Sequence, residues 1–160
     1  MSEDRISALE DRLRLLEDER EITRLVASYG PLVDAGRDEV ADLWTADGVY
    51  DVDELFMGDR EAVLAMVRSP EHQGLLARGC AHFLGPVHVT VEGDRARAVC
   101  HSVLLVAHEG RNYPVRIGAN LWHLVRTDDG WRAQHRVTRA LTGSEEARAL
   151  LAEGVLGPDA

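Results

Sequence analysis

Residues 95–141 read RARAVCHSVLLVAHEGRNYPVRIGANLWHLVRTDDGWRAQHRVTRAL, and they carry the clearest structural pattern in the chain. Runs of valine, leucine and other apolar residues with interspersed polar ones predict strands over 95–108, 113–126 and 131–141. The Asp-Asp-Gly sequence at 128–130 predicts a hairpin turn between the last two strands. This segment therefore predicts consecutive antiparallel strands in one sheet.

The residues before this segment mostly follow a helical period. A helix is predicted over 3–29, and Pro31 is expected to kink or restart it. Shorter helices are predicted over 38–44 and from an N-cap at Asp59 to about residue 69. Further strands are predicted over 49–52 and within 81–91, and a terminal helix over 144–151. Helices followed by a run of strands indicate an α+β fold, with one curved sheet closed by helices.

The composition excludes several classes of function. The chain has 160 residues, of which 45% are apolar, and this suits one domain with a real core and some appendages. All 18 basic side chains are arginine, so Schiff-base and P-loop chemistry that needs lysine is excluded. With 28 acidic side chains the formal net charge is −10, which argues against nucleic acid as a partner.

The sequence also lacks features of membrane and secreted proteins. No apolar run approaches the length of a membrane span, and the charged N-terminus has no signal-peptide core. We therefore expect a cytoplasmic protein with no membrane partner. Cys80 and Cys100 fit a reducing compartment as two thiols, although one disulfide is also compatible with the sequence.

Histidine is the most informative residue type for chemistry. The chain holds seven histidines; five lie in predicted strands, and His82 lies at or just before one. Imidazole suits acid–base work or metal binding. A metal site needs three or four converging ligands, and no short histidine pair with a nearby third ligand is present, so no metal is expected. For any one of the histidines in predicted strands, a structural role in the sheet is the ordinary interpretation.

Two other groups are candidates for a site. In the strand over 113–126, Gly118, Asn120 and Trp122 share one face. Asn120 needs hydrogen-bond partners between apolar neighbours, so it is either a polar anchor in a cavity or a structural group. Tyr29 and Asp34 lie where the first helix ends. An inward-facing Asp34 would pair with a histidine as an acid–base dyad, whereas an exposed one would merely precede a turn.

Several short motifs occur in a specific order. EITRLVASYGPLVDAG occupies 21–36, DEVADLWTADGV occupies 38–49, FMGDRE occupies 56–61, a histidine at 82 precedes a strand, and DGWR occupies 129–132. Over about residues 18–142, this order resembles the SnoaL-like families of the nuclear transport factor 2 superfold. It is most similar to the branch of scytalone dehydratase, bile-acid 7α-dehydratase and hexachlorocyclohexane dehydrochlorinase. The resemblance implies a cone domain over 18–142, an N-terminal helical extension over 1–17, and a C-terminal helix and tail over 143–160.

The resemblance also implies roles for particular residues. That branch shares an aspartate at the end of the first helix and a histidine before a central strand, which Asp34 and His82 match as the catalytic pair. Tyr29 matches a helix tyrosine of the two dehydratases as a third catalytic residue. The residues implied to bind substrate are His108, Asn120, Trp44, Trp122 and Arg139, with Arg136 as the alternative to Arg139. The helix lysine of the dehydrochlorinase is absent, which disfavours that activity.

The implied fold is a cone-shaped α+β barrel, in which N-terminal helices pack on a strongly curved sheet, mixed but mostly antiparallel, around an apolar pocket. The implied activity is that of a cofactor-independent lyase or isomerase of the dehydratase type. Its substrate would be a small hydrophobic steroid-, polyketide- or terpenoid-like molecule, from which His82, made more basic by Asp34, removes a proton. A polyketide cyclase or epoxide hydrolase in the same pocket, or a non-catalytic small-ligand-binding module, are the alternatives.

The N-terminal helix carries apolar residues at alternating steps of three and four, at Ile6, Leu9, Leu13 and Leu16. This seam either lies on its own domain or packs against another subunit. The resemblance implies self-association as a homotrimer or homodimer.

Overall fold

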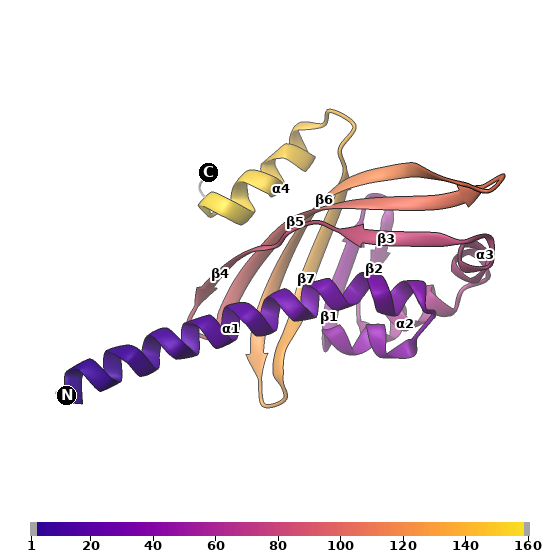
Figure 1. The fold of residues 1–160 in the computed structure, drawn as a ribbon. Helices are drawn as coiled ribbons and strands as arrows, with labels where there is room; N and C mark the ends of the chain where they lie inside the picture. Colours follow the sequence, from indigo (N-terminus) through magenta and orange to yellow (C-terminus); the bar gives the residue numbers. More distant parts are fainter. Residues whose placement is uncertain (1–2, 159–160) are drawn as a thin grey trace.

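The computed structural model describes residues 3–158 and shows helices packed against one curved sheet (Figure 1). The elements are α1 (Glu3–Asp34), the 3₁₀ helix η1 (Asp38–Leu43), β1 (Trp44–Val52), β2 (Leu55–Met57), α2 (Arg60–Arg68), α3 (Pro70–Arg78), β3 (Cys80–Leu84), β4 (His88–Glu92), β5 (Arg95–His108), β6 (Arg111–Thr127), β7 (Gly130–Ala140) and α4 (Glu145–Leu156). The predicted α+β class is confirmed. No helix within residues 3–158 combines the length and apolar character that a membrane span requires.

The sheet has seven strands in the order β2-β1-β7-β6-β5-β3, and β4 pairs with β5. β5, β6 and β7 pair antiparallel in succession, as residues 95–141 predict. β1 pairs parallel with β7, whereas β2, β3 and β4 pair antiparallel with their neighbours. The sheet is therefore mixed and mostly antiparallel, as expected.

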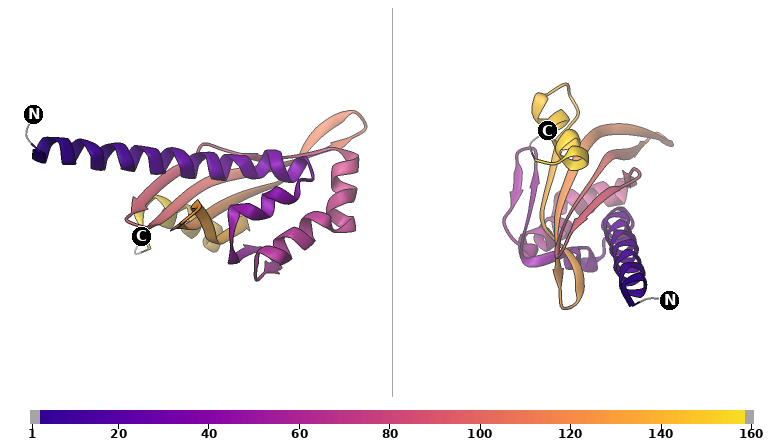
Figure 2. Two further views of the ribbon diagram at one scale, coloured as in Figure 1. Left: turned by 90° about the horizontal axis from the view of Figure 1, so that it is seen from below. Right: turned by 90° about the vertical axis from the view of Figure 1, so that its left-hand side faces the viewer.

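Helices cover both faces of the sheet. On the inner face, Tyr29 of α1 packs edge-on against Trp122 of β6, with ring centroids 6.1 Å apart. Val99 of β5 points the other way, because successive strand residues alternate between faces, and it packs against Gly154 of α4. α1 and α4 accordingly lie on opposite sides of the sheet (Figure 2). The inner face and α1 enclose the main core.

The first helix continues past the residue expected to interrupt it. α1 runs through Pro31 to Asp34, so the helix does not restart at Pro31. Proline removes a single backbone donor, and here it lies in the last turn between buried Gly30 and Val33. Packing of these neighbours outweighs the lost hydrogen bond. The expected domain boundary at residue 17 falls inside α1, and residues 1–2 and 159–160 of the predicted end segments lie outside the described residues.

Two further differences arise from local chemistry. The single strand expected within 81–91 is two strands, β3 and β4, separated by residues 85–87, where Pro86 lacks a backbone donor. The helix α3 was not predicted, although Pro70 occupies its first turn and the Ser69 hydroxyl caps it by accepting from the His72 backbone N–H. The Asp59 cap of α2 is confirmed by its bond from the Ala62 N–H at 2.7 Å.

A buried ion pair attaches the middle of α1 to the sheet. Both carboxylate oxygens of Asp18 accept hydrogen bonds from the guanidinium of Arg126 at 2.7 Å, and Trp131 Nε1 donates to the same carboxylate at 3.0 Å. The hydrogen bonds from Arg126 hold the pKa of Asp18 below its ordinary value. This contact determines where α1 crosses β6 and β7.

Candidate active site

The inner face of the sheet and the helices enclose a mostly apolar cavity of about 140 Å³. The polar side chains that line it are Tyr29, Tyr50, His82, Ser102, Arg116 and Arg136. An apolar pocket with a few convergent polar groups is the usual form of a small-molecule site.

Strand register explains which residues face this cavity. Residues paired across neighbouring strands point to the same face. His82 of β3 pairs with Leu104 of β5, which pairs with Arg116 of β6, and all three line the cavity. Nearer the middle of the sheet, Arg136 of β7 pairs with Tyr50 on one side and with Trp122 on the other. The cross-strand register thus places an arginine between two aromatic rings.

Asp34 and His82 form a hydrogen-bonded pair at the cavity wall. Asp34 Oδ1 lies 2.6 Å from His82 Nδ1, and the His82 backbone N–H donates to Asp34 Oδ2 at 2.7 Å. Both side chains are about one-fifth exposed, so they are shielded from solvent without being sealed off. With Nδ1 donating its proton to the carboxylate, Nε2 of a neutral imidazole remains free to accept one.

Close packing of α1 against β3 makes this pair possible. Gly30 of α1 contacts the carbonyl oxygen of His82, and a Cβ at position 30 would lie 2.2 Å from that oxygen. One turn further along α1, Asp34 reaches the backbone and the ring of His82. The absence of a side chain at position 30 therefore sets the distance between the two members of the pair.

Cys80 adds a thiol beside the carboxylate. Its Sγ donates to Asp34 Oδ1 at 3.7 Å, and burial, with a smaller contribution from Asp34, raises the thiol pKa to about 11. The thiol is therefore protonated at neutral pH. Asp34, Cys80 and His82 each offer one ligand atom within 4.8 Å of the others, so they are the residues that could hold a metal ion. Cys80 carries no signal of this position in the sequence, because β3 and the end of α1 meet only in the fold.

Tyr29 is buried next to the Asp34–His82 pair. Its ring is edge-on to His82, with centroids 6.2 Å apart, and the same ring packs against Trp44, Tyr50 and Trp122. Burial, and to a lesser extent the neighbouring Tyr50, raises the Tyr29 pKa well above its ordinary value. Its phenol therefore stays protonated and is able to donate a hydrogen bond. This places Tyr29, Asp34 and His82, the three expected catalytic residues, in one cluster.

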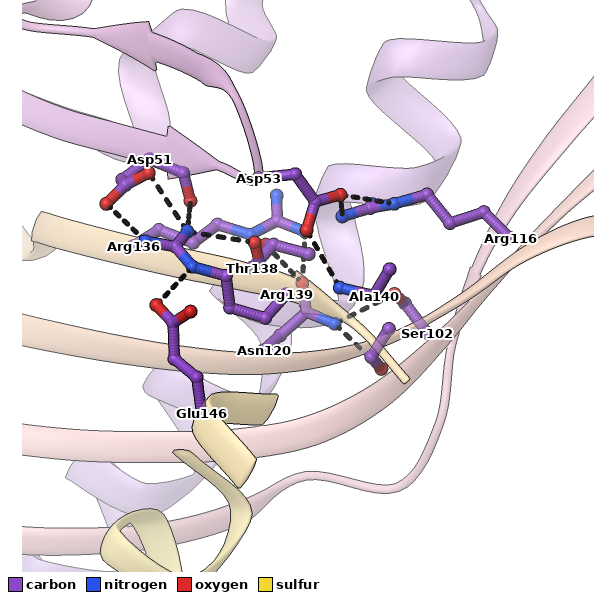
Figure 3. Close-up of polar contacts among 11 residues, drawn as sticks. Asp51, Asp53, Ser102, Arg116, Asn120, Arg136, Thr138, Arg139, Ala140 and Glu146 are labelled. Atoms are coloured by element: carbon purple, nitrogen blue, oxygen red, sulfur yellow. Dashed lines mark hydrogen bonds and ion pairs between the residues drawn. The ribbon is translucent and has the colours of Figure 1, made fainter. Parts of the chain in front are cut away.

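Of the two candidate arginines of β7, Arg136 lines the cavity and Arg139 does not. Arg136 lines the cavity, with its Cζ 4.0 Å from the Tyr29 ring centroid. Arg139 points to the opposite face, where it forms ion pairs with Asp51 and with Glu146 of α4 (Figure 3). Alternation along β7 separates the two residues. The expectation that Arg139 binds substrate does not fit this position, whereas the alternative, Arg136, does.

Asn120 and the two tryptophans lie behind the cavity wall. Asn120 is fully buried; its Nδ2 donates to Ser102 Oγ, and its Oδ1 accepts from Arg136 Nη2 and Thr138 Oγ1, each at 2.8 Å (Figure 3). Trp44 and Trp122 are completely buried and pack on each other with ring centroids 5.7 Å apart. The direct substrate contacts expected for these three residues are not supported, because their side chains support those that line the cavity.

His108 lies outside the cavity. It ends β5, two residues beyond Val106, which pairs with Cys80 at the start of β3. The hairpin of β5 and β6 extends past β3 there (Figure 1), so the His108 side chain is 75% exposed. This position does not fit the expectation that His108 binds substrate in the cavity. The sequence pattern of β5 does not show where the neighbouring strand β3 ends.

Tyr50 and Ser102 line the cavity without having been singled out from the sequence. Tyr50 lies in the short strand that was predicted, and Ser102 lies in β5 two residues before Leu104, which also lines the cavity. A tyrosine or serine in a strand carries no signal of its own. Only cross-strand register brings these residues to the cavity.

These features define a class: an α+β protein whose curved sheet and N-terminal helices enclose an apolar pocket with an Asp–His pair in its wall. The model of the SnoaL-like domain matches residues 14–137, and the chain belongs to this family. The resemblance found in the sequence is thereby confirmed.

Solved structures agree with this assignment. A nuclear transport factor 2-like protein with a cystatin-like fold from Novosphingobium aromaticivorans is 47% identical, with a TM-score of 0.91 over 94% of this chain and 99% of that one. A candidate aromatic ring hydroxylase from this species is 25% identical, with a TM-score of 0.66 over 79% and 91% of the two chains. A candidate scytalone dehydratase from the same species shares the fold at 18% identity, with a TM-score of 0.65 over 79% and 86%. No curated protein matches the sequence.

Proposed function

We propose that the protein is a cofactor-independent lyase or isomerase of the dehydratase type that acts on a small, largely apolar molecule. The observation that carries this proposal is the hydrogen-bonded Asp34–His82 pair in the wall of an apolar cavity. A carboxylate that holds the Nδ1 proton orients the imidazole and stabilises the imidazolium that forms when Nε2 takes a proton. A structural histidine would not need to face a cavity.

The proposed reaction begins when His82 Nε2 removes a proton from a carbon beside a carbonyl group. The electrons of the broken C–H bond form a double bond. In an elimination, the bond to a β-hydroxyl then breaks, and the leaving oxygen receives the proton from the imidazolium and departs as water. In an isomerisation, the imidazolium returns the proton to another carbon. Tyr29, which stays protonated, donates a hydrogen bond to the oxygen that gains charge.

The volume of the cavity limits the size of the substrate. A cavity of about 140 Å³ is close to the roughly 150 Å³ of an apolar protein cavity that holds benzene. Among the substrate classes implied by the sequence, a polyketide- or terpenoid-like molecule of about one ring matches this volume better than a steroid does.

The proposal is tested with a panel of one-ring β-hydroxyketones, following alkene formation by absorbance and mass spectrometry. His82→Ala is expected to lower turnover by about 10²- to 10⁴-fold, because it removes the general base. His101→Ala is the matched control, since His101 is exposed on β5 and does not line the cavity. Equal turnover by native protein and His82→Ala, or no turnover by either, would count against this reaction for the class.

The same assay separates the alternatives. A polyketide cyclase or epoxide hydrolase would convert its own substrates and leave the hydroxyketones unchanged. A non-catalytic binding module would bind them without turnover, and His82→Ala would affect binding alone.

Both Cys80 and Cys100 are free thiols, which supports the cytoplasmic location that we include in the proposal.

We also propose that the protein self-associates as a homodimer or homotrimer. Phe83, Val103 and Ile117 pair across β3, β5 and β6 on one face, and the Phe83 and Ile117 side chains are at least half exposed. Exposed apolar surface of this kind is typical of subunit interfaces. Sedimentation velocity measures the oligomer, and Phe83→Glu is expected to shift it to monomer. A native monomer at all concentrations would refute this proposal.

A further inference from the structure

The guanidinium of Arg136 is buried without a full set of partners. The residue is 2% exposed, and its Nη2 donates to Asn120 Oδ1 at 2.8 Å. Its Nε and Nη1 have no hydrogen-bond partner among the described residues, and both atoms are shielded from solvent. Arginine keeps its charge in proteins, so this is a buried cation whose donors are only partly satisfied.

No carboxylate of residues 3–158 forms an ion pair with this cation. Asp51 pairs with Arg139 and Asp53 with Arg116 (Figure 3). Asp34 is hydrogen-bonded to His82. Within that part of the chain, no acidic side chain lines the cavity. In a protein with a net charge of −10, the interior of the pocket therefore holds an unpaired positive charge.

Three aromatic rings surround Arg136 and hold it in place. Its Cζ lies 4.0 Å from the ring centroid of Tyr29, 4.2 Å from that of Trp122 and 4.3 Å from that of Tyr50. Cation–π attraction offsets part of the desolvation of the charge, but it leaves the Nε and Nη1 protons without acceptors. A charge held rigidly by its neighbours, but not neutralised by them, is suited to pair with an anionic ligand.

We propose that the cavity binds a one-ring apolar molecule that carries a carboxylate, and that the carboxylate pairs with Arg136. Arg136 lines the cavity, and Nη2 has a second hydrogen besides the one given to Asn120. The second Nη2 hydrogen lies on one of the two bidentate edges, Nη1–Nη2 or Nε–Nη2, where it combines with an unpartnered nitrogen, and a carboxylate reaches this edge when the aromatic rings that shield it move aside. The proposal rests on the proposed function, in that both place the substrate in this cavity.

The arrangement also orients such a ligand. The Tyr29 ring lies between the two ends of the site, with the His82 ring centroid 6.2 Å away and the Arg136 Cζ 4.0 Å away. A carboxylate held at Arg136 leaves the apolar ring of the ligand to extend along Tyr29 toward His82. The carboxylate of the ligand would thus determine which substrates bind, and it would position a carbon of the ligand near His82.

The test measures binding without turnover. Cyclohexanecarboxylate and benzoate are titrated against the corresponding carboxamides at neutral pH, where the acids are ionised, and affinities are read from amide chemical shifts in NMR spectra. The acid and amide of each pair match in shape and differ in charge. Each acid is expected to bind about tenfold or more tightly than its amide, from the strength of hydrogen bonds to a charged group.

Two variants assign this preference to Arg136. Arg136→Met removes the charge, and Asn120→Asp keeps Arg136 in place while giving it an internal carboxylate partner. Ser102 and Thr138 carry hydroxyls that can both donate to an aspartate at position 120, so this variant preserves the buried network. Both variants are expected to reduce the acid-over-amide preference to less than about twofold.

A double variant, Asp53→Asn with Arg116→Gln, serves as the control for the other arginine of the cavity. It removes the ion pair between the two residues with no change in net charge, so the preference is expected to remain. Loss of the preference in this variant alone would overturn the proposal. Three other results would also overturn the proposal. They are equal affinity for acid and amide, no binding of either acid, and an acid-over-amide preference that survives Asn120→Asp.

These outcomes are distinct from a failure of the proposed reaction. Acid-selective binding that depends on Arg136, together with equal turnover by native protein and His82→Ala, would refute the reaction and leave the carboxylate site standing. Hydroxyketone turnover that depends on His82, with no selectivity for acids, would refute the carboxylate site alone. Arg136 would then serve an oxygen that becomes negative only during the reaction.

Discussion

Gly30→Ala tests the close packing of α1 on β3, which positions Asp34 against His82. In an ordinary helix, replacing glycine by alanine stabilises the fold by roughly 0.4–1 kcal/mol. At Gly30 the added Cβ would lie 2.2 Å from the carbonyl oxygen of His82. Contacts between heavy atoms prefer about 3.5 Å, so α1 and β3 must separate by about 1 Å. We therefore expect a loss of about 1–3 kcal/mol, the opposite sign to the helical preference.

Equilibrium unfolding in urea, followed by tryptophan fluorescence, measures this change. Gly74→Ala is the matched control, because Gly74 is an exposed residue of α3 and an added Cβ would meet nothing within 4 Å. This control is expected to gain about 0.5–1 kcal/mol, so the two variants should differ by about 2 kcal/mol or more.

Gly30→Ala should also change the geometry of the candidate active site. Moving α1 away from β3 separates Asp34 from His82, so Gly30→Ala should lose turnover even under conditions where it is fully folded. If Gly30→Ala is as stable as the native protein, or gains stability as Gly74→Ala does, the packing argument is refuted. Native activity in a folded Gly30→Ala protein would show that the pair does not depend on this contact.

The remaining predictions concern the buried ion pair of α1 and the packing of α4. Asp18→Asn is expected to cost about 2 kcal/mol in unfolding free energy at neutral pH, because hydrogen bonds from Arg126 to a charged carboxylate are lost. The pKa of Asp18 is lowered in the fold, so its stabilisation is present above the unfolded pKa of about 3.9 and is lost as pH falls through the folded value. Urea unfolding should accordingly show the native and Asp18→Asn proteins converging in acid, and a pH-independent difference would contradict this. Gly154→Ala is expected to destabilise by about 1–3 kcal/mol, since its Cβ would lie 2.3 Å from Val99 Cβ, and thermal unfolding unchanged from native would refute that contact.

Much of the fold follows from local pattern. The strands over 95–108, 113–126 and 131–141 lie within one or two residues of β5, β6 and β7, because their apolar runs and the turn at 128–130 are local signals. The Asp59 cap is equally local. The interruption at Pro31 was wrong because tertiary packing of the last turn of α1 outweighs the backbone preference of one residue.

Some features of the candidate site were also identifiable from the sequence, whereas others are visible only in the structure. The residues of the pair, Asp34 and His82, were identifiable from the sequence through the order of family motifs, and the structure brings them within 2.6 Å. Asn120 was correctly recognised as a buried amide that needs partners, and its partners prove to be structural ones. A polar residue among apolar neighbours signals burial, but its sequence position does not say which side of a cavity wall it occupies.

Composition, period and motif order were thus sufficient for the α+β class, the family and the two residues of the Asp34–His82 pair, because these depend on short segments read one at a time. The choice between Arg136 and Arg139, the exposure of His108 and the unpaired charge at Arg136 depend on which residues oppose one another across β1, β7 and β6, and on where β3 ends. Strand register is fixed by long-range pairing, and shifting it by one residue moves every side chain to the opposite face. The polar interior of this pocket therefore emerges only when the sheet is assembled.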